Sequence, residues 1–325
     1  MTYEQRGTID ANGTHYVLSG PTFSSNLVVF VHGLGNYSFA WRDLEDLFHK
    51  SGYRTLSYDL VGRGFSQASE DDDYSLGVYS SQLHSMMEQH ISQQYENVYM
   101  VAHSMGGVIL SEYITKHYDA QGYQNKIKAV SFVTPAGCMN MMCGLFSTVQ
   151  FLMRCCSCCG NYLEAALTKP EEIEKGWMAD FVNSESVAAK DALSHLQGLL
   201  HSPDNGKKHF HATIQSLFII PFTNHHDCII KLSTDPRFDA LRVQTIFAGK
   251  DVTIPCDSNR LAWSRLLTQK QNKMYYQDDI LEMAGHGCIT EFASDVFHTI
   301  YGFIQDKMNE KEVVMEEGVN VQLLK

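Results

Sequence analysis

The chain has 325 residues, enough for one large domain with a buried core, and its 44% share of hydrophobic residues excludes a mainly disordered protein. The formal net charge is -12 and we find no basic stripe, so nucleic acid is excluded as a partner. The N-terminal residues lack the basic start and apolar run of a secretory signal, so we expect a cytoplasmic protein whose nine cysteines are reduced.

The predicted elements begin with two strands joined at Asn12-Gly13, a dipeptide favoured in two-residue hairpin turns. Short apolar runs without alternation follow at 27–31, 55–58, 98–102, 129–133 and 243–247, which is typical of strands covered on both faces. Apolar residues recur at helical spacing between some of these runs, at 76–91 and 110–117. The alternation predicts an α/β fold with a mostly parallel central sheet and helices on both faces.

This rhythm stops between residues 138 and 237, where the sequence has helical character and few strand-like runs. We interpret this segment as an inserted helical cap over the C-terminal edge of the sheet, where open α/β sheets bind their ligands. The core then comprises residues 1–137 and 238–308. The segment 309–325 is expected to be a C-terminal tail that is partly disordered.

One serine stands between small residues in the stretch MVAHSMGGVIL, where a predicted strand turns into a predicted helix. A turn of this kind lifts the serine above the sheet edge. The pattern is that of the nucleophile elbow, Gly-x-Ser-x-Gly, with Ala102 in place of its first glycine. Ser104 is therefore the candidate nucleophile, and the alternative is a serine in an ordinary turn.

A serine hydroxyl is a weak nucleophile at neutral pH, so it needs a base and a group that orients the base. Asp251 follows the strand predicted at 243–247, and His286 lies in a glycine-flanked loop ahead of a helix. Backbone N–H groups must also hold the oxyanion that forms when a carbonyl is attacked. The loop His32-Gly33-Leu34-Gly35 follows an apolar strand, and we predict the amides of Leu34 and Met105 as the donors.

These pieces together resemble the α/β-hydrolase superfamily, specifically its capped branch of monoacylglycerol-lipase-like and carbon–carbon-bond hydrolases. The matching motifs run in order from Val31 to Gly287: VHGLG, YDLVGRGFS, AHSMGG, TPAG, GKD and GHG. The order serine, aspartate, histidine is also the one that this superfamily uses. The resemblance implies a triad of Ser104, Asp251 and His286, no cofactor, and a structural role for Asp59. The sequence departs from the family pattern at two positions. Ala102 replaces the first glycine of the elbow, and Gly249 stands two residues before Asp251, where relatives often have a glycine three before. Neither departure removes a catalytic group.

A serine nucleophile predicts acyl transfer to water, with a small-molecule ester as the substrate. The methionines, leucines and phenylalanines between 139 and 153 suit a lipid-like acyl chain, although a helix packed into the protein's own core has the same composition. We predict substrate contacts from His32, Gly33, His103 and Phe146, and no metal ligands. The alternatives are a carbon–carbon-bond or thioester hydrolase with the same triad, and a binding scaffold without catalysis; the oligomeric state stays open.

Four cysteines gather in the segment RCCSCCG: Cys155, Cys156, Cys158 and Cys159. Beside an apolar helix and a basic residue they can take reversible palmitate, which would attach the protein peripherally to a membrane. Zinc binding is a second interpretation, although ligands packed this closely fit one tetrahedron poorly. A cysteine-rich loop without special chemistry is the third. The neighbouring apolar stretch is interrupted by polar residues, so we predict a buried or interfacial helix and no membrane span.

Overall fold

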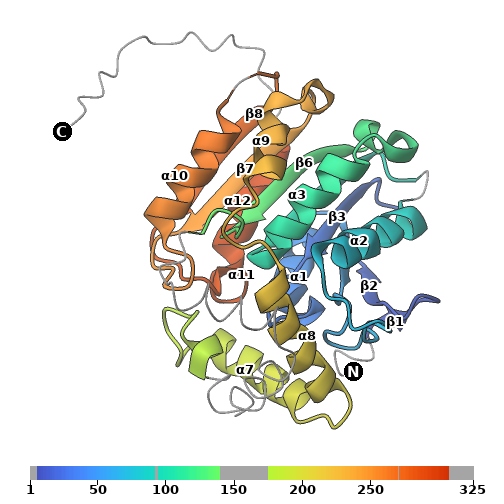
Figure 1. Cartoon of the computed structure of the whole chain (residues 1–325), viewed down its shortest axis with the longest axis vertical. Coiled ribbons are helices and arrows are strands. Elements are labelled where there is room, and N and C mark those ends of the chain that lie inside the picture. The colour runs from blue at the N-terminus through green and yellow to red at the C-terminus, as the bar shows by residue number, and fades with distance from the viewer. Residues whose placement is uncertain (1–5, 92–93, 140–174, 270, 307–325) are drawn as a thin grey trace, which may run out of the picture.

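The computed structural model describes residues 6–91, 94–139, 175–269 and 271–306. Within these ranges an eight-stranded sheet forms the centre of the molecule (Figure 1), with the strand order β1-β2-β4-β3-β5-β6-β7-β8. Its strands are β1 (Thr8–Ile9), β2 (His15–Ser19), β3 (Asn26–Val31), β4 (Arg54–Tyr58), β5 (Asn97–His103), β6 (Ile127–Val133), β7 (Arg242–Ala248) and β8 (Tyr275–Leu281).

The strands β4, β3, β5, β6, β7 and β8, which are neighbours in that order, are all parallel. The strand β2 pairs antiparallel with both β1 and β4. The two predicted strands pair as an antiparallel hairpin, but residues 10–14 form the loop between them in place of a two-residue turn. Gly13 has a φ of 76°, and its N–H donates to the Asp10 oxygen at 3.1 Å. Because the parallel strands all run the same way, their carboxyl ends meet at one edge of the sheet. The predicted α/β-hydrolase fold is confirmed.

Helices cover both faces of this sheet. Side chains of β3 alternate between two apolar cores: Val28 and Phe30 enter one, Leu27 and Val29 the other. The first core is closed by α1 (Arg42–Lys50) and α12 (Ala293–Gln305). The second is closed by α2 (Leu76–His90), α3 (Met105–His117), α9 (His226–Thr234) and α10 (Cys256–Leu267). Short elements complete the described fold: α11 (Cys288–Glu291), η2 (Ser38–Trp41), η3 (Ala120–Asn125) and η4 (Pro236–Phe238).

The segment between β6 and β7 contains the predicted cap. In its described part, α7 (Val187–Leu200) packs on α8 (Asn205–Ile219), and both lie beyond one end of the sheet (Figure 1). The following helix, α9, packs on α3 and α10 and so belongs to the layer over the sheet. That layer therefore resumes at His226, ahead of the predicted boundary at 237, and the division into core and cap stays a prediction.

Some sequence predictions lie outside the described residues: Phe146, the four clustered cysteines and the tail at 309–325. Every helix in the described ranges falls short of the length and apolar character that a bilayer span requires.

Candidate active site

Ser104 occupies a strained turn between β5 and α3. Its backbone has φ 53° and ψ −120°, a region that residues with a side chain seldom adopt. The helix that follows packs close, since a Cβ added at Gly106 would lie 2.3 Å from the carbonyl oxygen of Val31. A Cβ added at Gly33 would likewise lie 2.9 Å from the Ser104 Cβ. A larger residue at Gly106 or Gly33 would therefore clash with its neighbours. The turn places the Ser104 side chain at the edge of the sheet.

Three side chains from separate loops meet at this edge. The His286 Nε2 lies 3.0 Å from the Ser104 Oγ, and its Nδ1 lies 2.8 Å from the Asp251 Oδ2. The other Asp251 oxygen accepts the backbone N–H groups of Thr253 at 2.9 Å and Ile254 at 2.7 Å. Asp251 follows β7 and His286 follows β8, so parallel strand ends bring the residues together although 182 positions separate histidine and serine.

The electrostatics of His286 suit a base. Its burial alone would lower the pKa, but the hydrogen bond and the negative charge of Asp251 outweigh this and raise the pKa above its usual 6.5, with a further contribution from Asp180. In the neutral ring, Nδ1 donates its proton to Asp251, so Nε2 is free to accept the Ser104 hydroxyl.

Asp180 is a second carboxyl group beside this site. Its Oδ1 accepts the hydroxyl of Thr253, and its backbone oxygen accepts the Gly287 N–H at 2.8 Å. Burial raises the pKa of Asp180 above the usual value for an aspartate. No motif in the sequence indicates Asp180, because it lies between β6 and β7 and is far along the chain from each of its partners.

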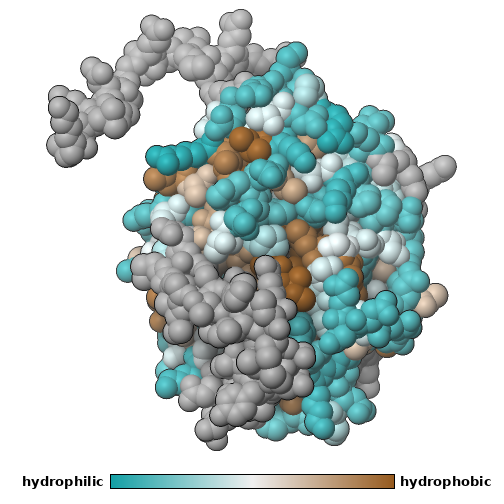
Figure 2. Space-filling view, in the orientation of Figure 1, coloured by the Kyte–Doolittle hydropathy of each residue, from teal (hydrophilic) through white to brown (hydrophobic). Residues whose placement is uncertain are grey.

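A cavity of about 320 Å³ lies above Ser104 and His286. Its wall is mostly apolar: Leu34, Met139, Trp177, Phe181, Leu217, Phe222, Ile254 and Ile289 contribute, and Asp180 and Thr253 are among its polar members. A second cavity of about 390 Å³ shares Leu34, Trp177, Asp180, Leu217 and Thr253 and continues along Leu196, Leu200, Phe210 and Ile214 of α7 and α8. The face in Figure 2 is hydrophilic over most of its area, with apolar residues gathered near its middle.

The predicted oxyanion residues flank the serine. Leu34 lines the same cavity as Ser104, and Met105 is the first residue of α3, where backbone N–H groups have no partner within the helix. The role of the two amides as oxyanion donors stays a prediction.

Of the predicted substrate contacts, His103 and Gly33 lie beside Ser104, whereas His32 does not face the cavity. His103 lines the cavity, but its Nε2 donates to the carbonyl oxygen of His286 at 2.9 Å and thereby fixes the loop that carries His286. Burial lowers the pKa of His103 to about 3, so the ring is neutral. Gly33 packs directly against Ser104.

His32 differs from this prediction. It is fully buried and is absent from the walls of the cavities in the described residues. Its Nδ1 donates to the Gly33 oxygen at 2.9 Å, and its Nε2 accepts the Leu60 N–H at 3.0 Å. Both ring nitrogens are therefore engaged with backbone, and His32 holds two loops together without facing the cavity. Burial lowers its pKa to about 4, which keeps it neutral for this task.

Asp59, which follows β4, is structural. Its carboxylate accepts the backbone N–H groups of Ser38 at 2.7 Å and Phe65 at 2.8 Å, and it lies 2.9 Å from the His15 Nδ1. These partners use both of its oxygens at a fully buried position. Asp59 therefore has no part in orienting His286.

Comparisons with known proteins agree with this fold. A model of the α/β hydrolase fold family matches residues 26–150. A probable lysophospholipase of Arabidopsis thaliana, BODYGUARD 4, is 30% identical over 127 residues, which are 39% of this chain and 28% of the relative. A putative chloroplastic methylesterase 14 of the same plant is 30% identical over 117 residues, or 35% of this chain and 31% of the relative. The matches thus span about a third of the length of these relatives or less.

Among solved structures, an esterase from Exiguobacterium antarcticum superposes with a TM-score of 0.66 at 16% identity, covering 92% of this chain and 98% of the esterase. A bacterial membrane phospholipase A gives a TM-score of 0.65 at 16% identity, covering 90% of this chain and 82% of that one. At these identities the likeness shows the fold alone. With the sheet, the strained serine and the match of the family model to residues 26–150 taken together, the chain has the α/β-hydrolase fold.

Proposed function

We propose that this protein is a serine hydrolase that cleaves carboxylic esters. The observation that carries the proposal is the unbroken hydrogen-bonded chain from Ser104 through His286 to Asp251, at the base of a mostly apolar cavity. Ser104 attacks the carbonyl while His286 takes its proton, and His286 then gives that proton to the leaving alcohol. Asp251 holds the imidazole tautomer and stabilises its charged form. The amides of Leu34 and Met105 hold the oxyanion. Water then releases the acyl group from Ser104 by the same steps.

We further propose a lipid-like substrate. The apolar lining of both cavities supports it, because a chain bound at Ser104 can continue past the shared wall of Leu34 and Leu217 toward Leu200. The similarity to a probable lysophospholipase favours the same class. The similarity to a putative methylesterase favours a small ester instead.

Labelling with a fluorophosphonate probe tests the serine chemistry. Wild-type protein should be labelled, and Ser104→Ala and His286→Ala should not, since the first removes the nucleophile and the second the base. Labelling that persists in folded Ser104→Ala would place the reactive serine elsewhere. A folded wild type that the probe leaves unlabelled would favour a binding scaffold.

A graded ester series tests the substrate class. For p-nitrophenyl esters from acetate to laurate, kcat/KM should rise with chain length in the wild type. Leu200→Trp, which narrows the second cavity, should reduce kcat/KM for the laurate and leave the acetate unchanged. Equal values across the series would argue for a small ester. Thioesters of the same acyl chains, measured in parallel, distinguish an ester hydrolase from a thioester hydrolase.

A further inference from the structure

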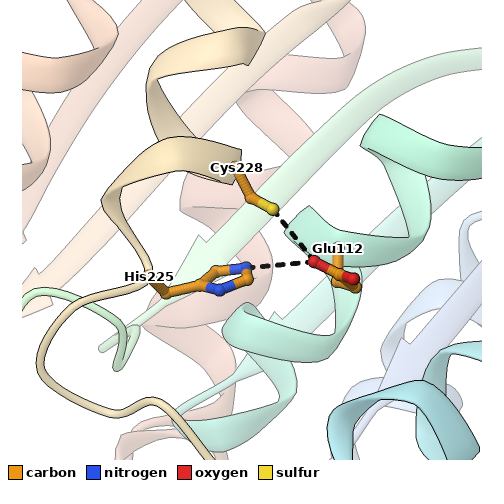
Figure 3. Close-up of side chains that lie close together, drawn as sticks. All are labelled: Glu112, His225 and Cys228. Carbon is orange, nitrogen blue, oxygen red and sulfur yellow. Dashed lines mark hydrogen bonds and ion pairs between the residues drawn. The ribbon is translucent and has the colours of Figure 1, made fainter.

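Three side chains with metal-binding atoms meet between α3 and α9 (Figure 3): Glu112 from α3, His225 just before α9 and Cys228 in its first turn. The nearest ligand atoms of the three all lie within 4.8 Å of one another. Figure 3 shows the imidazole and the thiol both directed at the Glu112 carboxylate. Glu112 and Cys228 are 116 positions apart, so no local spacing in the sequence indicates the cluster.

The individual distances leave one atom without a partner. The Cys228 Sγ lies 2.9 Å from the Glu112 Oε2, whereas the His225 Nε2 is 3.9 Å from the same oxygen, too far for a hydrogen bond. The His225 side chain is 6% exposed, and within the described part of the chain its buried Nε2 has no hydrogen-bond partner. A buried ring nitrogen aimed at a carboxylate and a thiol, yet bonded to neither, indicates a place for a ligand between the three.

The carboxylate is already fixed in the orientation that such a ligand needs. The Lys116 Nζ binds the other oxygen, Oε1, at 2.5 Å, which leaves Oε2 facing His225 and Cys228. Other charged or titratable groups act on the cluster from α9 itself: Asp227 and His226 act on His225, and Lys231 acts on Cys228.

We propose that Glu112, His225 and Cys228 bind a zinc ion, with a water molecule in the fourth position. Imidazole nitrogen, thiolate sulfur and carboxylate oxygen are the ligand types of protein zinc sites, and bonds of their usual lengths place neighbouring ligand atoms about 3.3–3.7 Å apart. The observed 2.9 Å and 3.9 Å lie on either side of that range, so small side-chain rotations complete the site. The thiol proton of Cys228 leaves to solvent as the Zn–S bond replaces the S–H···O hydrogen bond.

The position of the site points to a structural task. The inserted segment leaves and re-enters the core here: the Gly137 N–H donates to the Phe222 oxygen at 2.8 Å, and the His225 N–H donates to the Gly137 oxygen at 2.9 Å. Neither cavity has Glu112, His225 or Cys228 in its wall. A zinc ion would therefore tie the root of the insertion to α3, the helix that follows Ser104, and would not touch the substrate.

The test uses full-length protein in which Cys155, Cys156, Cys158 and Cys159 are replaced by serine, so that those thiols bind no metal. Metal-free protein is titrated with Zn²⁺ in competition with a chromophoric chelator. We expect one equivalent per chain. His225→Asn and Cys228→Ser should each weaken the Zn²⁺ affinity at least tenfold, and Cys256→Ser, at a half-buried cysteine outside the cluster, should not change it.

Cobalt gives a second readout, which is taken first on the folded parent protein. Co²⁺ added to the same parent protein should produce a thiolate-to-cobalt charge-transfer band, and Cys228→Ser should abolish it. A folded parent that gives no such band and takes up no zinc would overturn the proposal, and the cluster would then be a buried hydrogen-bonded group only. Equal Zn²⁺ affinity in the parent, His225→Asn and Cys228→Ser would overturn it as well. These outcomes are independent of whether Ser104 is reactive.

Discussion

Asp251 accepts hydrogen bonds from His286 and from the backbone N–H groups of Thr253 and Ile254. This fixes one carboxylate oxygen in its own loop and leaves the other for the imidazole. The second carboxyl group, Asp180, contacts Thr253 and acts on His286 through space only. The two aspartates therefore influence the same imidazole by different means, one through a hydrogen bond and the other through charge.

This difference predicts distinct pH profiles. Activity needs neutral His286, whose pKa is raised above 6.5, so kcat/KM should fall as the pH drops through that raised pKa. Asp180→Asn removes only a charge contribution and should move the acid limb of the profile to slightly lower pH. Asp251→Asn removes the hydrogen bond as well, and should move the limb further and lower kcat by about 10⁴-fold.

The measurement is kcat/KM for one ester between pH 5.5 and 9, with circular dichroism at each pH to confirm folding. An acid limb that stays in place in both variants would contradict the assignment of His286 as the base. A shift in Asp180→Asn as large as that in Asp251→Asn would contradict the division of roles.

Sequence predicted the members of this site that follow strands within recognisable motifs: Ser104, Asp251 and His286. Asp180 could not be predicted from the sequence, because its position beside Thr253 depends on how the segment between β6 and β7 packs against the core. The sequence pattern also assigned His32 to substrate binding, because a sequence shows that a histidine stands in a glycine loop but not which way its ring points. Only the packed structure shows both ring nitrogens of His32 bound to backbone.

At the scale of elements, the strands that sequence identified from apolar runs are those covered on both faces, such as β3 and β6. The exposed strand β1 was identified from the turn dipeptide that follows it. The strand β8 was missed because it lies at the sheet edge and reads YYQDDIL, with every position at least partly exposed. Its two aspartates accept hydrogen bonds from neighbouring side chains. The Arg260 Nε–H donates to Asp278 at 2.6 Å, and the Gln244 Nε2–H donates to Asp279 at 2.7 Å. Tertiary pairing thus overrides the weak local preference.

The contact between α3 and β3 gives a prediction for Gly106→Ala. The new Cβ would lie 2.3 Å from the Val31 carbonyl oxygen, so α3 must move away from the sheet and carry Ser104 with it. We expect the free energy of unfolding to fall by about 1–3 kcal/mol, and kcat/KM to fall more than tenfold.

Gly302→Ala is the matched control, because an added Cβ in α12 meets nothing within 4 Å. This change should raise the free energy of unfolding by up to about 1 kcal/mol and leave activity unchanged. Urea unfolding and ester hydrolysis measure both variants. Wild-type activity in Gly106→Ala would show that the elbow tolerates a shifted helix.

At the scale of the whole molecule, stability depends on histidines that fold as neutral groups. His32, His103 and His209 are buried, and burial lowers their pKa values to about 4, 3 and 3. Each is protonated near pH 6.5 in the unfolded chain, so each contributes stability that is present above 6.5 and is lost as the pH falls toward the folded-state pKa. Glu45 acts in the opposite direction, because burial raises its pKa to about 7 and its stabilising effect is lost as the pH rises through that value.

Around pH 5.5 these four groups alone leave the unfolded chain with about two more bound protons than the folded one, so they should lower the free energy of unfolding by roughly 2.5 kcal/mol per pH unit of acidification. Urea midpoints at pH 7.5, 6.5, 5.5 and 5.0 measure this. His209→Gln keeps a hydrogen-bonding side chain where the ring accepts the Gly64 N–H at 3.2 Å, and it should make the slope shallower by about 1.4 kcal/mol per pH unit. Glu45→Gln should make the slope steeper, because it removes the group that opposes acid unfolding. An unfolding free energy that is flat from pH 7.5 to 5.0 would mean that these histidines are accessible to protons in the folded protein.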